Sequence, residues 1–111
     1  MAKPPIIKKG YKNMIYNVTK SLIDNDGYQY ICGMLQEPKL NDRGLWHRIK
    51  AFDILLNHKK QKSTLSVFYW INGVPCDFKN IKEFKNEIID ETEVERVLEE
   101  CGLITEDFNA H

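Results

Sequence analysis

The sequence predicts a small single-domain α+β protein, in which a short, mostly antiparallel sheet is covered by helices. The chain has 111 residues, which is the usual size of one domain. With 42% hydrophobic and 29% charged residues, its composition is that of a globular protein and not of a disordered chain. Stretches with helical spacing alternate with short aromatic and β-branched runs. The expected element order is helix, strand, helix, hairpin, helix, helix.

The N-terminal third of the chain predicts a lead-in, a helix and a strand. Residues 1–10 contain two prolines and a glycine, so we expect a flexible basic lead-in before a domain that spans 11–108. Over residues 11–24, apolar side chains recur every three or four positions, which favours a helix. Asn25-Asp26-Gly27 is typical of a helix end followed by a turn. The aromatic and apolar run at 28–35 is too short for a typical helix and predicts a strand.

Residues 43–58 are compatible with two structures. Leu45, Ile49, Phe52 and Leu56 are separated by four, three and four positions, which is the spacing of one helix face. A preceding Asn or Asp would cap such a helix. The alternation of side chains from 46 to 56 fits a strand less well, so a helix is favoured and a strand is kept as the alternative.

The region after residue 62 predicts a β-hairpin. Residues 65–71 and 74–78 are rich in β-branched and aromatic side chains, and Asn72-Gly73 between them is a strong signal for a tight turn. Pro75 has no N–H to donate to a neighbouring strand, so the second arm should lie at a sheet edge.

Two helices are expected to close the chain. Asn80 is a suitable cap for the first, with Glu83 three positions later and apolar residues at helical spacing behind it. Thr92-Glu93-Val94-Glu95 has the pattern of a capping box and predicts the start of the second. Gly102 should end that second helix.

The charge of the chain is balanced overall but separated along the sequence. Residues 1–62 hold 12 Lys and Arg against 5 Asp and Glu, whereas residues 63–111 hold 4 against 11. A net charge of zero argues against a histone-like binder and against a polyanion mimic. The two halves either form surfaces of opposite sign or neutralise each other in the fold.

The aromatic run at 65–71 is the most informative part of the sequence. In a strand, Phe68 and Trp70 point to one face, whereas Leu65, Val67 and Tyr69 point to the other. Because both sets are apolar, one interpretation is a central strand covered by helices on both faces. The other is that Phe68 and Trp70 belong to an exposed aromatic platform, which would suit a protein partner or stacked bases.

The segment 39–62 is strongly basic. On a helix, Arg43, His47 and Lys50 would share one exposed stripe. A basic stripe beside aromatic side chains is the arrangement that binds nucleic acid, although no nucleic-acid-binding motif is present. The residues of this alternative hypothesis are Arg43, Arg48, Lys50, Lys59, Lys60 and Lys62.

Catalytic and metal-binding patterns are weak. Cys76 with His47 or His58 as its base is the one candidate for nucleophilic catalysis, and we keep an unrecognised cysteine-dependent enzyme as a further alternative. The three cysteines and three histidines do not have the spacing of metal ligands. No catalytic residue, metal or cofactor is therefore expected.

The function predicted from these patterns is binding. An odd number of widely spaced cysteines and no signal peptide favour the cytoplasm, and no membrane association is expected. We expect a non-enzymatic regulatory or inhibitory accessory protein that binds another protein, of the size of phage-borne and mobile-element modulators. A homodimer is possible. The predicted partner-binding residues are Trp46, His47, Lys50, Phe68 and Trp70.

Overall fold

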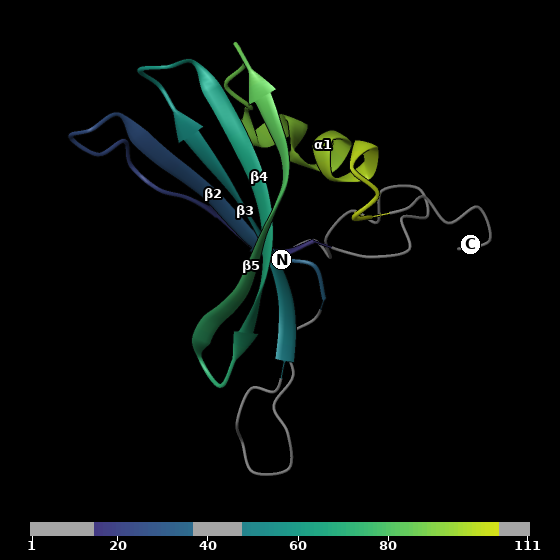
Figure 1. The fold of residues 1–111 in the computed structure, drawn as a ribbon. Coiled ribbons are helices and arrows are strands. Elements are labelled where there is room, and N and C mark those ends of the chain that lie inside the picture. Colours follow the sequence, from purple (N-terminus) through teal and green to yellow (C-terminus); the bar gives the residue numbers. More distant parts are fainter. Residues whose placement is uncertain (1–14, 37–47, 105–111) are drawn as a thin grey trace, which may run out of the picture.

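The computed structural model describes residues 15–36 and 48–104, which form a β-meander followed by one short helix (Figure 1). The strands are β1 (Tyr16–Lys20), β2 (Tyr28–Met34), β3 (Arg48–Asn57), β4 (Lys62–Ile71) and β5 (Val74–Lys85). They pair in sequence order, and every pair is antiparallel. The 3-10 turn η1 (Glu91–Glu93) and the helix α1 (Val94–Glu100) follow the sheet.

The predicted fold class is wrong. The sequence predicts four helices over a short sheet, whereas the described ranges contain a five-stranded antiparallel sheet and a single short α-helix. The term α+β therefore fits only loosely. The basic lead-in expected at residues 1–10 lies outside the described residues.

The helix predicted for residues 11–24 is replaced, in its described part, by β1 and a polar connection. Asp24 accepts hydrogen bonds from the backbone N–H groups of Asp26 and Tyr28 at 2.9 Å each, which closes the turn into β2. The apolar side chains that suggested a helix face are not buried there, since Leu22 is 91% exposed. The strand predicted for 28–35 is confirmed as β2.

The helix predicted for residues 43–58 is wrong over its described part, because residues 48–57 form β3. This strand pairs with β4 over ten consecutive residues, from Arg48 opposite Ile71 to Asn57 opposite Lys62. Long-range pairing with the β-rich β4 overrides the local helical spacing. The spacing was misleading because β3 has apolar residues on both faces: Phe52 and Ile54 on one, Ile49 on the other.

The predicted hairpin is confirmed as β4 and β5. Asn72 and Gly73 have φ angles of 52° and 83°, as a two-residue turn of the left-handed type requires. β5 is an edge strand, as Pro75 predicted. However, β5 continues to Lys85, so the helix predicted to begin at Asn80 is absent from this part of the chain.

The second C-terminal helix is confirmed as α1, but its start differs from the prediction. The capping box is at the preceding 3-10 turn η1 and begins at Asp90, not Thr92: the Asp90 carboxylate accepts from Thr92 N–H, while Glu93 accepts from Asp90 N–H. The N-cap residue of α1 itself is Glu93, which makes no side-chain capping hydrogen bond. At the other end, Gly102 has a φ of 74°. Gly102 and Leu103 donate back into the last turn, which is the glycine-ended stop expected from the sequence.

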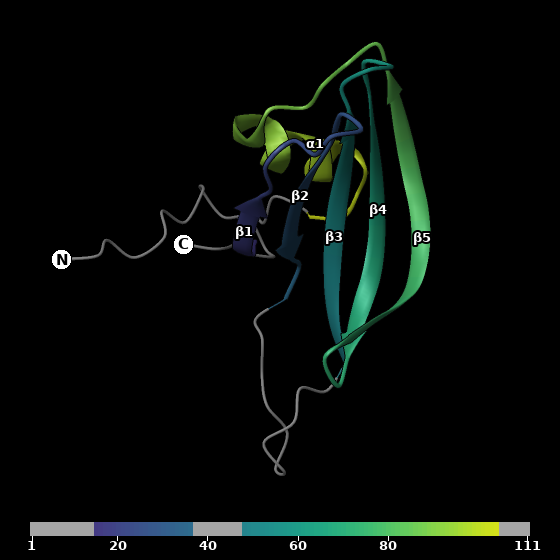
Figure 2. The same ribbon diagram turned by 90° about the vertical axis from the view of Figure 1, so that its left-hand side faces the viewer.

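The core lies between one face of the sheet and the C-terminal segment (Figure 2). Buried side chains of the sheet pack against buried side chains of α1 and of the residues beside it. The sheet contributes Ile31, Phe52, Ile54, Leu56, Leu65, Val67 and Phe84, and the C-terminal segment contributes Ile89, Val94, Val97, Leu98 and Ile104. This helix covers one face, so the expectation of helices over both faces is wrong for the described residues.

Candidate binding face

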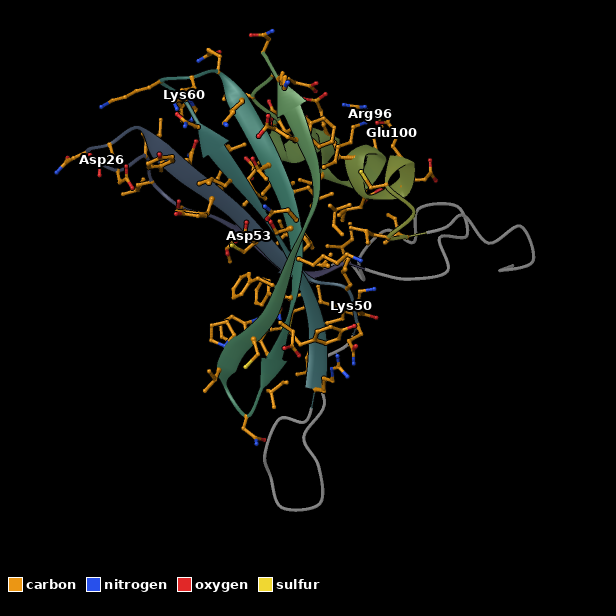
Figure 3. The ribbon with its side chains drawn as sticks, in the orientation of Figure 1. Asp26, Lys50, Asp53, Lys60, Arg96 and Glu100 are labelled. Atoms are coloured by element: carbon orange, nitrogen blue, oxygen red, sulfur yellow. The ribbon has the colours of Figure 1, made fainter. Side chains whose placement is uncertain are left out.

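The sheet face opposite α1, called the open face below, is not covered by any other described element. Strand alternation and the pairing register assign its side chains. Its lower half, toward the Asn72-Gly73 turn, is aromatic, whereas its upper half is polar (Figure 3). The side chains of the open face include Tyr28, Tyr30, Cys32, Asp53, Lys62, Thr64, Ser66, Phe68, Trp70, Phe78, Asn80 and Glu83.

The aromatic cluster of the open face consists of Phe68, Trp70 and Phe78. Phe68 and Phe78 stack with ring centroids 4.7 Å apart and an interplanar angle of 16°. Trp70 meets Phe68 edge to face at 5.4 Å. Phe68 is only 5% exposed, while Phe78 is 58% exposed. Phe78 is therefore the accessible member, and Phe68 supports it from below.

A β-bulge in the edge strand places Phe78 in this cluster. Val67 pairs with Lys79 and Tyr69 pairs with Cys76, so Asp77 and Phe78 both lie opposite Phe68. Asp77 has a φ of 58°, which bends the strand locally. Bulges of this kind redirect side chains, and here the result is that Phe78 stacks on Phe68.

A small apolar hollow of about 190 Å³ lies beside the aromatic cluster. Phe68 and Trp70 form one wall, and residues of β1 and β2 form the other. The lining residues from these two strands are Asn17, Thr19, Cys32, Gly33 and Met34. The aromatic cluster thus continues into a concave surface.

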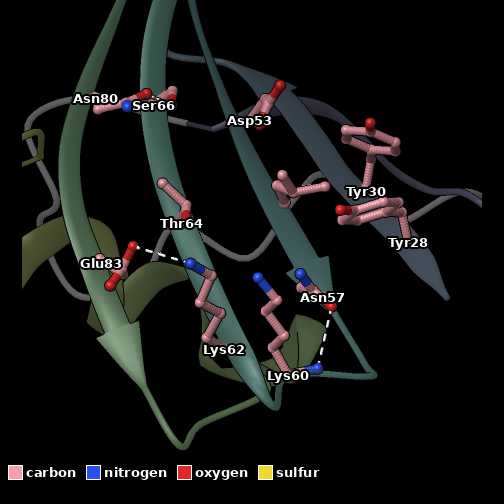
Figure 4. Close-up of a pocket in the computed structure, with 11 residues that line it drawn as sticks. Tyr28, Tyr30, Asp53, Asn57, Lys60, Lys62, Thr64, Ser66, Asn80 and Glu83 are labelled. Carbon is pink, nitrogen blue, oxygen red and sulfur yellow. Dashed lines mark hydrogen bonds and ion pairs between the residues drawn. The ribbon is translucent and has the colours of Figure 1, made fainter. Parts of the chain in front are cut away.

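A larger polar hollow, of about 390 Å³, occupies the upper half of the open face (Figure 4). Tyr28 and Tyr30 form the wall on the β2 side, and Asn80 and Glu83 form the wall on the β5 side. Side chains of β3 and β4 make its floor. These floor residues are Asp53, Leu55, Asn57, Lys62, Thr64 and Ser66, and Lys60 reaches in from the β3–β4 turn.

Two pairs of polar side chains in this hollow hold each other in position. Lys62 Nζ lies 3.3 Å from Glu83 Oε2, and the two form an ion pair. Ser66 Oγ donates to Asn80 Oδ1 at 2.8 Å, which ties β4 to the edge strand. Figure 4 shows Lys60 at the same end of the hollow as this ion pair, with Asp53 at the other end. The hollow is therefore basic at one end and acidic at the other.

The acidic end is electrostatically unusual. Burial raises the pKa of the Asp53 carboxyl above its ordinary value. Cys32 lies directly opposite Asp53 on β2, and burial together with the neighbouring Asp53 charge raises the pKa of its thiol to about 11. Within the two described ranges, the Asp53 side chain has neither a hydrogen bond nor an ion pair.

The predicted partner-binding residues are only partly brought together. Phe68 and Trp70 are in contact on the open face, with Phe68 less accessible than an exposed platform requires. Lys50 lies opposite Tyr69. Because side chains alternate along a strand, Lys50 lies on the face of the sheet that α1 covers, not on the open face (Figure 3). Trp46 and His47 lie outside the described residues.

The predicted nucleic-acid residues do not share one stripe. Arg48 stacks over the Tyr69 ring at 3.9 Å, and, like Lys50, it lies near the start of β3. Lys59 and Lys60 lie in the turn after that strand, which places the two groups about 30 Å apart along the ten residues of β3. Lys62 is paired with Glu83, as described above, and Arg43 lies outside the described residues.

Cys76 and His58 are also far apart. Cys76 pairs with Tyr69 on β4, whereas His58 follows the strand end that pairs with Lys62. Cys76 and His58 are therefore seven residues apart along the direction of β4, which is about 23 Å. His58 Nε2 instead lies 2.9 Å from the Oε1 of Gln29, and the Cys76 thiol donates to the Val74 carbonyl at 3.3 Å. His58 is therefore too distant to act as a base for Cys76.

Several residues of the open face were missed by sequence reasoning. Tyr28 and Tyr30 alternate within a correctly predicted strand, so their shared face was a usable signal. Asp53 was hidden by the helical interpretation of its segment. Phe78 was recognised as part of the hairpin, but the bulge that directs it onto Phe68 leaves no mark in the sequence pattern.

Residues 15–36 and 48–104 contain neither a metal-binding cluster nor a membrane-spanning helix. No group of three His, Cys, Asp or Glu side chains is placed to hold a metal ion there. No helix of that part of the chain is long and apolar enough to cross a membrane.

Comparisons of the chain with models of protein families, with curated proteins and with solved structures found no match.

Proposed function

We propose that this protein is a non-enzymatic accessory protein that binds another protein through the open face and thereby regulates or inhibits it. The observation that supports this most is the stacked aromatic cluster on a sheet face that α1 does not cover. Protein interfaces are enriched in aromatic anchors that lie on well-packed supports and are ringed by polar groups. Phe78, supported by Phe68 and Trp70 and adjoining the polar hollow, has this arrangement.

Nucleic acid is the second class of partner to consider, and it has less support. Binding to a phosphate backbone requires several unpaired cations along one surface. The polar hollow instead combines Lys60 and Lys62 with Asp53 and Glu83, so these four side chains carry no net charge. Tyr28 and Tyr30 would offer stacking surfaces, but the cations that would hold phosphates beside them are balanced by carboxylates.

We also propose that the protein works in the cytoplasm, since its three cysteines are free thiols in the structure and reduced thiols are usual in that compartment.

A capture experiment with a matched pair of variants tests the binding proposal. Tagged wild-type protein, Phe78→Ala and Leu22→Ala are each used to capture proteins from host lysate, with and without nuclease treatment. Leu22 is a suitable control because it is an exposed apolar side chain in the β1–β2 connection. We expect one protein at stoichiometric level with wild type and Leu22→Ala. With Phe78→Ala its affinity should fall at least about tenfold, as for a central aromatic anchor.

Two outcomes would contradict the proposal. Equal retention by Phe78→Ala and wild type would remove the aromatic cluster from the interface. Nucleic acid carried through without nuclease, with all captured proteins lost after digestion, would favour the nucleic-acid alternative.

A further inference from the structure

The acidic end of the polar hollow contains a carboxylate whose partner is not supplied by the described chain. Asp53 is half-buried on β3, and the side chains nearest to it in register are neutral: Cys32 on β2 and Ser66 on β4 lie opposite it. The Ser66 hydroxyl hydrogen is already directed to Asn80. A carboxylate in this position has lost part of its hydration without gaining a hydrogen bond or a cation from the described residues.

The lysines of the hollow do not supply that cation. Lys62 is held by Glu83 at 3.3 Å, on the β5 side of the hollow. Lys60 lies in the β3–β4 turn, at the opposite end from Asp53 (Figure 4). Asp53 and Asn57, which lies beside that turn, are four residues apart on β3, or about 13 Å.

The wall beside Asp53 suits a cation from outside. Tyr30 is 41% exposed and lies diagonally across from Asp53, since its register partner is Leu55. The face of a tyrosine ring attracts a guanidinium or ammonium group placed over it. A cation beside Asp53 on the β2 side would therefore meet a carboxylate and a ring face.

We propose that the acidic end of the polar hollow receives an arginine or lysine side chain of the protein that binds the open face. This inference rests on the proposed function. It also specifies the partner's chemistry. Asp53 pairs with Ser66, two residues before Phe68 on the same face of β4. Phe78, the accessible aromatic side chain, lies two strands from Asp53 and two residues further along the sheet. The partner therefore presents a basic side chain about 12 Å from the apolar side chain that contacts Phe78.

A titration that does not need the partner tests this inference. N-acetyl-L-arginine amide is added to ¹⁵N-labelled full-length protein at neutral pH, and amide chemical shifts are followed. N-acetyl-L-citrulline amide is the control probe, since it has nearly the same shape without the charge. We expect saturable shifts that cluster at Tyr30, Asp53 and Ser66 with the arginine probe and not with the citrulline probe.

Two variants distinguish the contributions of the two carboxylates of the hollow to binding of the arginine probe. Asp53→Asn should weaken arginine binding at least about tenfold, because a charge-assisted hydrogen bond to a carboxylate is lost. Glu83→Gln should leave the affinity for the probe within about twofold of wild type, since surface charges at that distance are screened. The unchanged amide spectrum of each free variant away from its substitution confirms that it is folded.

Three results would overturn the inference: equal shifts with the citrulline probe, retained arginine binding in Asp53→Asn, or loss of binding in Glu83→Gln alone. These results leave the proposed function intact if Phe78→Ala still weakens protein capture. Conversely, arginine binding without any captured protein would contradict the proposed function while leaving a cation site at Asp53.

Discussion

At the scale of single residues, the buried hydroxyl of Ser63 connects the sheet to the C-terminal segment. Ser63 is 0% exposed. Its Oγ donates to the Glu87 carbonyl at 2.7 Å and accepts from the Ile89 N–H at 3.0 Å. These two hydrogen bonds fix the chain between β5 and η1, and therefore the position from which α1 covers the core.

Replacement of Ser63 by alanine should therefore destabilise the protein. The variant removes the partner of the buried Ile89 N–H and of the half-buried Glu87 carbonyl, which costs about 1–3 kcal/mol in the free energy of unfolding. Urea unfolding followed by circular dichroism measures this change. Thr64→Ala is the matched control, because its side chain lies on the open face in the polar hollow. An effect of Ser63→Ala no larger than that of Thr64→Ala would show that the two hydrogen bonds do not support the fold.

Asp53 links stability to pH in the opposite direction from a paired carboxylate. Burial raises its pKa in the folded state, so the folded protein binds the proton more tightly than the unfolded chain. The stabilisation that comes from this tighter proton binding is complete below the pKa of Asp53 in the unfolded chain. It is lost as pH rises through the pKa of Asp53 in the folded protein. Above both values, the carboxylate remains charged and incompletely hydrated.

We therefore expect Asp53→Asn to melt at a higher temperature than wild type at pH 7. The difference should shrink as pH falls toward 3, where both side chains are neutral. Differential scanning fluorimetry over this pH range measures the difference between the two melting temperatures. A lower melting temperature for the variant at pH 7 would mean that the Asp53 charge is compensated inside the protein.

At the scale of elements, β2 and β3 approach each other closely where Gly33 faces Phe52. A Cβ built on Gly33 would lie 2.7 Å from Cε1 and 2.8 Å from Cζ of the Phe52 ring. Phe52 is completely buried and pairs with Gly33 across the two strands. The ring therefore occupies the space that any other side chain at position 33 would need.

Gly33→Ala should be destabilising because it forces this ring out of its position. Overpacking of this kind costs about 1–3 kcal/mol. Phe52→Leu is destabilising for a different reason, since it leaves a cavity. In the double variant the smaller side chain makes room for the new methyl group, so it should be less destabilised than the sum of the two single variants. Strict additivity of the three unfolding free energies would contradict this contact.

Elements formed by local interactions were predicted from the sequence, whereas elements formed by long-range pairing were not. The β4–β5 turn and the stop of α1 depend on Asn72, Gly73 and Gly102, whose backbone conformations are local, and both were predicted. β3 and the second half of β5 depend on pairing with β4. Their apolar residues at helical spacing fit a helix locally, and only the long-range register excludes it.

The candidate site was predictable to a smaller degree. The opposite orientation of Phe68 and Val67 followed from strand alternation and is confirmed. The position of Phe78 depends on the bulge at Asp77, and the position of Asp53 depends on β3 being a strand. Neither condition is encoded by a local pattern that can be read from one sequence.

At the scale of the whole molecule, the two faces of the sheet differ in character. On the side of α1, Arg96 lies within 4.0 Å of Glu87, Glu93 and Glu100. These exposed ion pairs contribute little to stability. Lys60 lies on the side of the open face (Figure 3). The charge separation along the sequence is therefore not kept as one basic and one acidic face, since Lys50 of the basic half lies on the helix side and Glu83 of the acidic half lines the open face.

The central claim is that the open face is the surface that contacts a partner, and site-directed photo-crosslinking tests it most directly. A photoreactive benzoylphenylalanine is introduced in place of Phe78 on the open face, or of Glu91, which is exposed in η1 on the other side. After irradiation in host lysate, we predict a discrete crosslinked protein from position 78 and none from position 91. The same crosslinked protein from both positions, or one from position 91 alone, would contradict the claim.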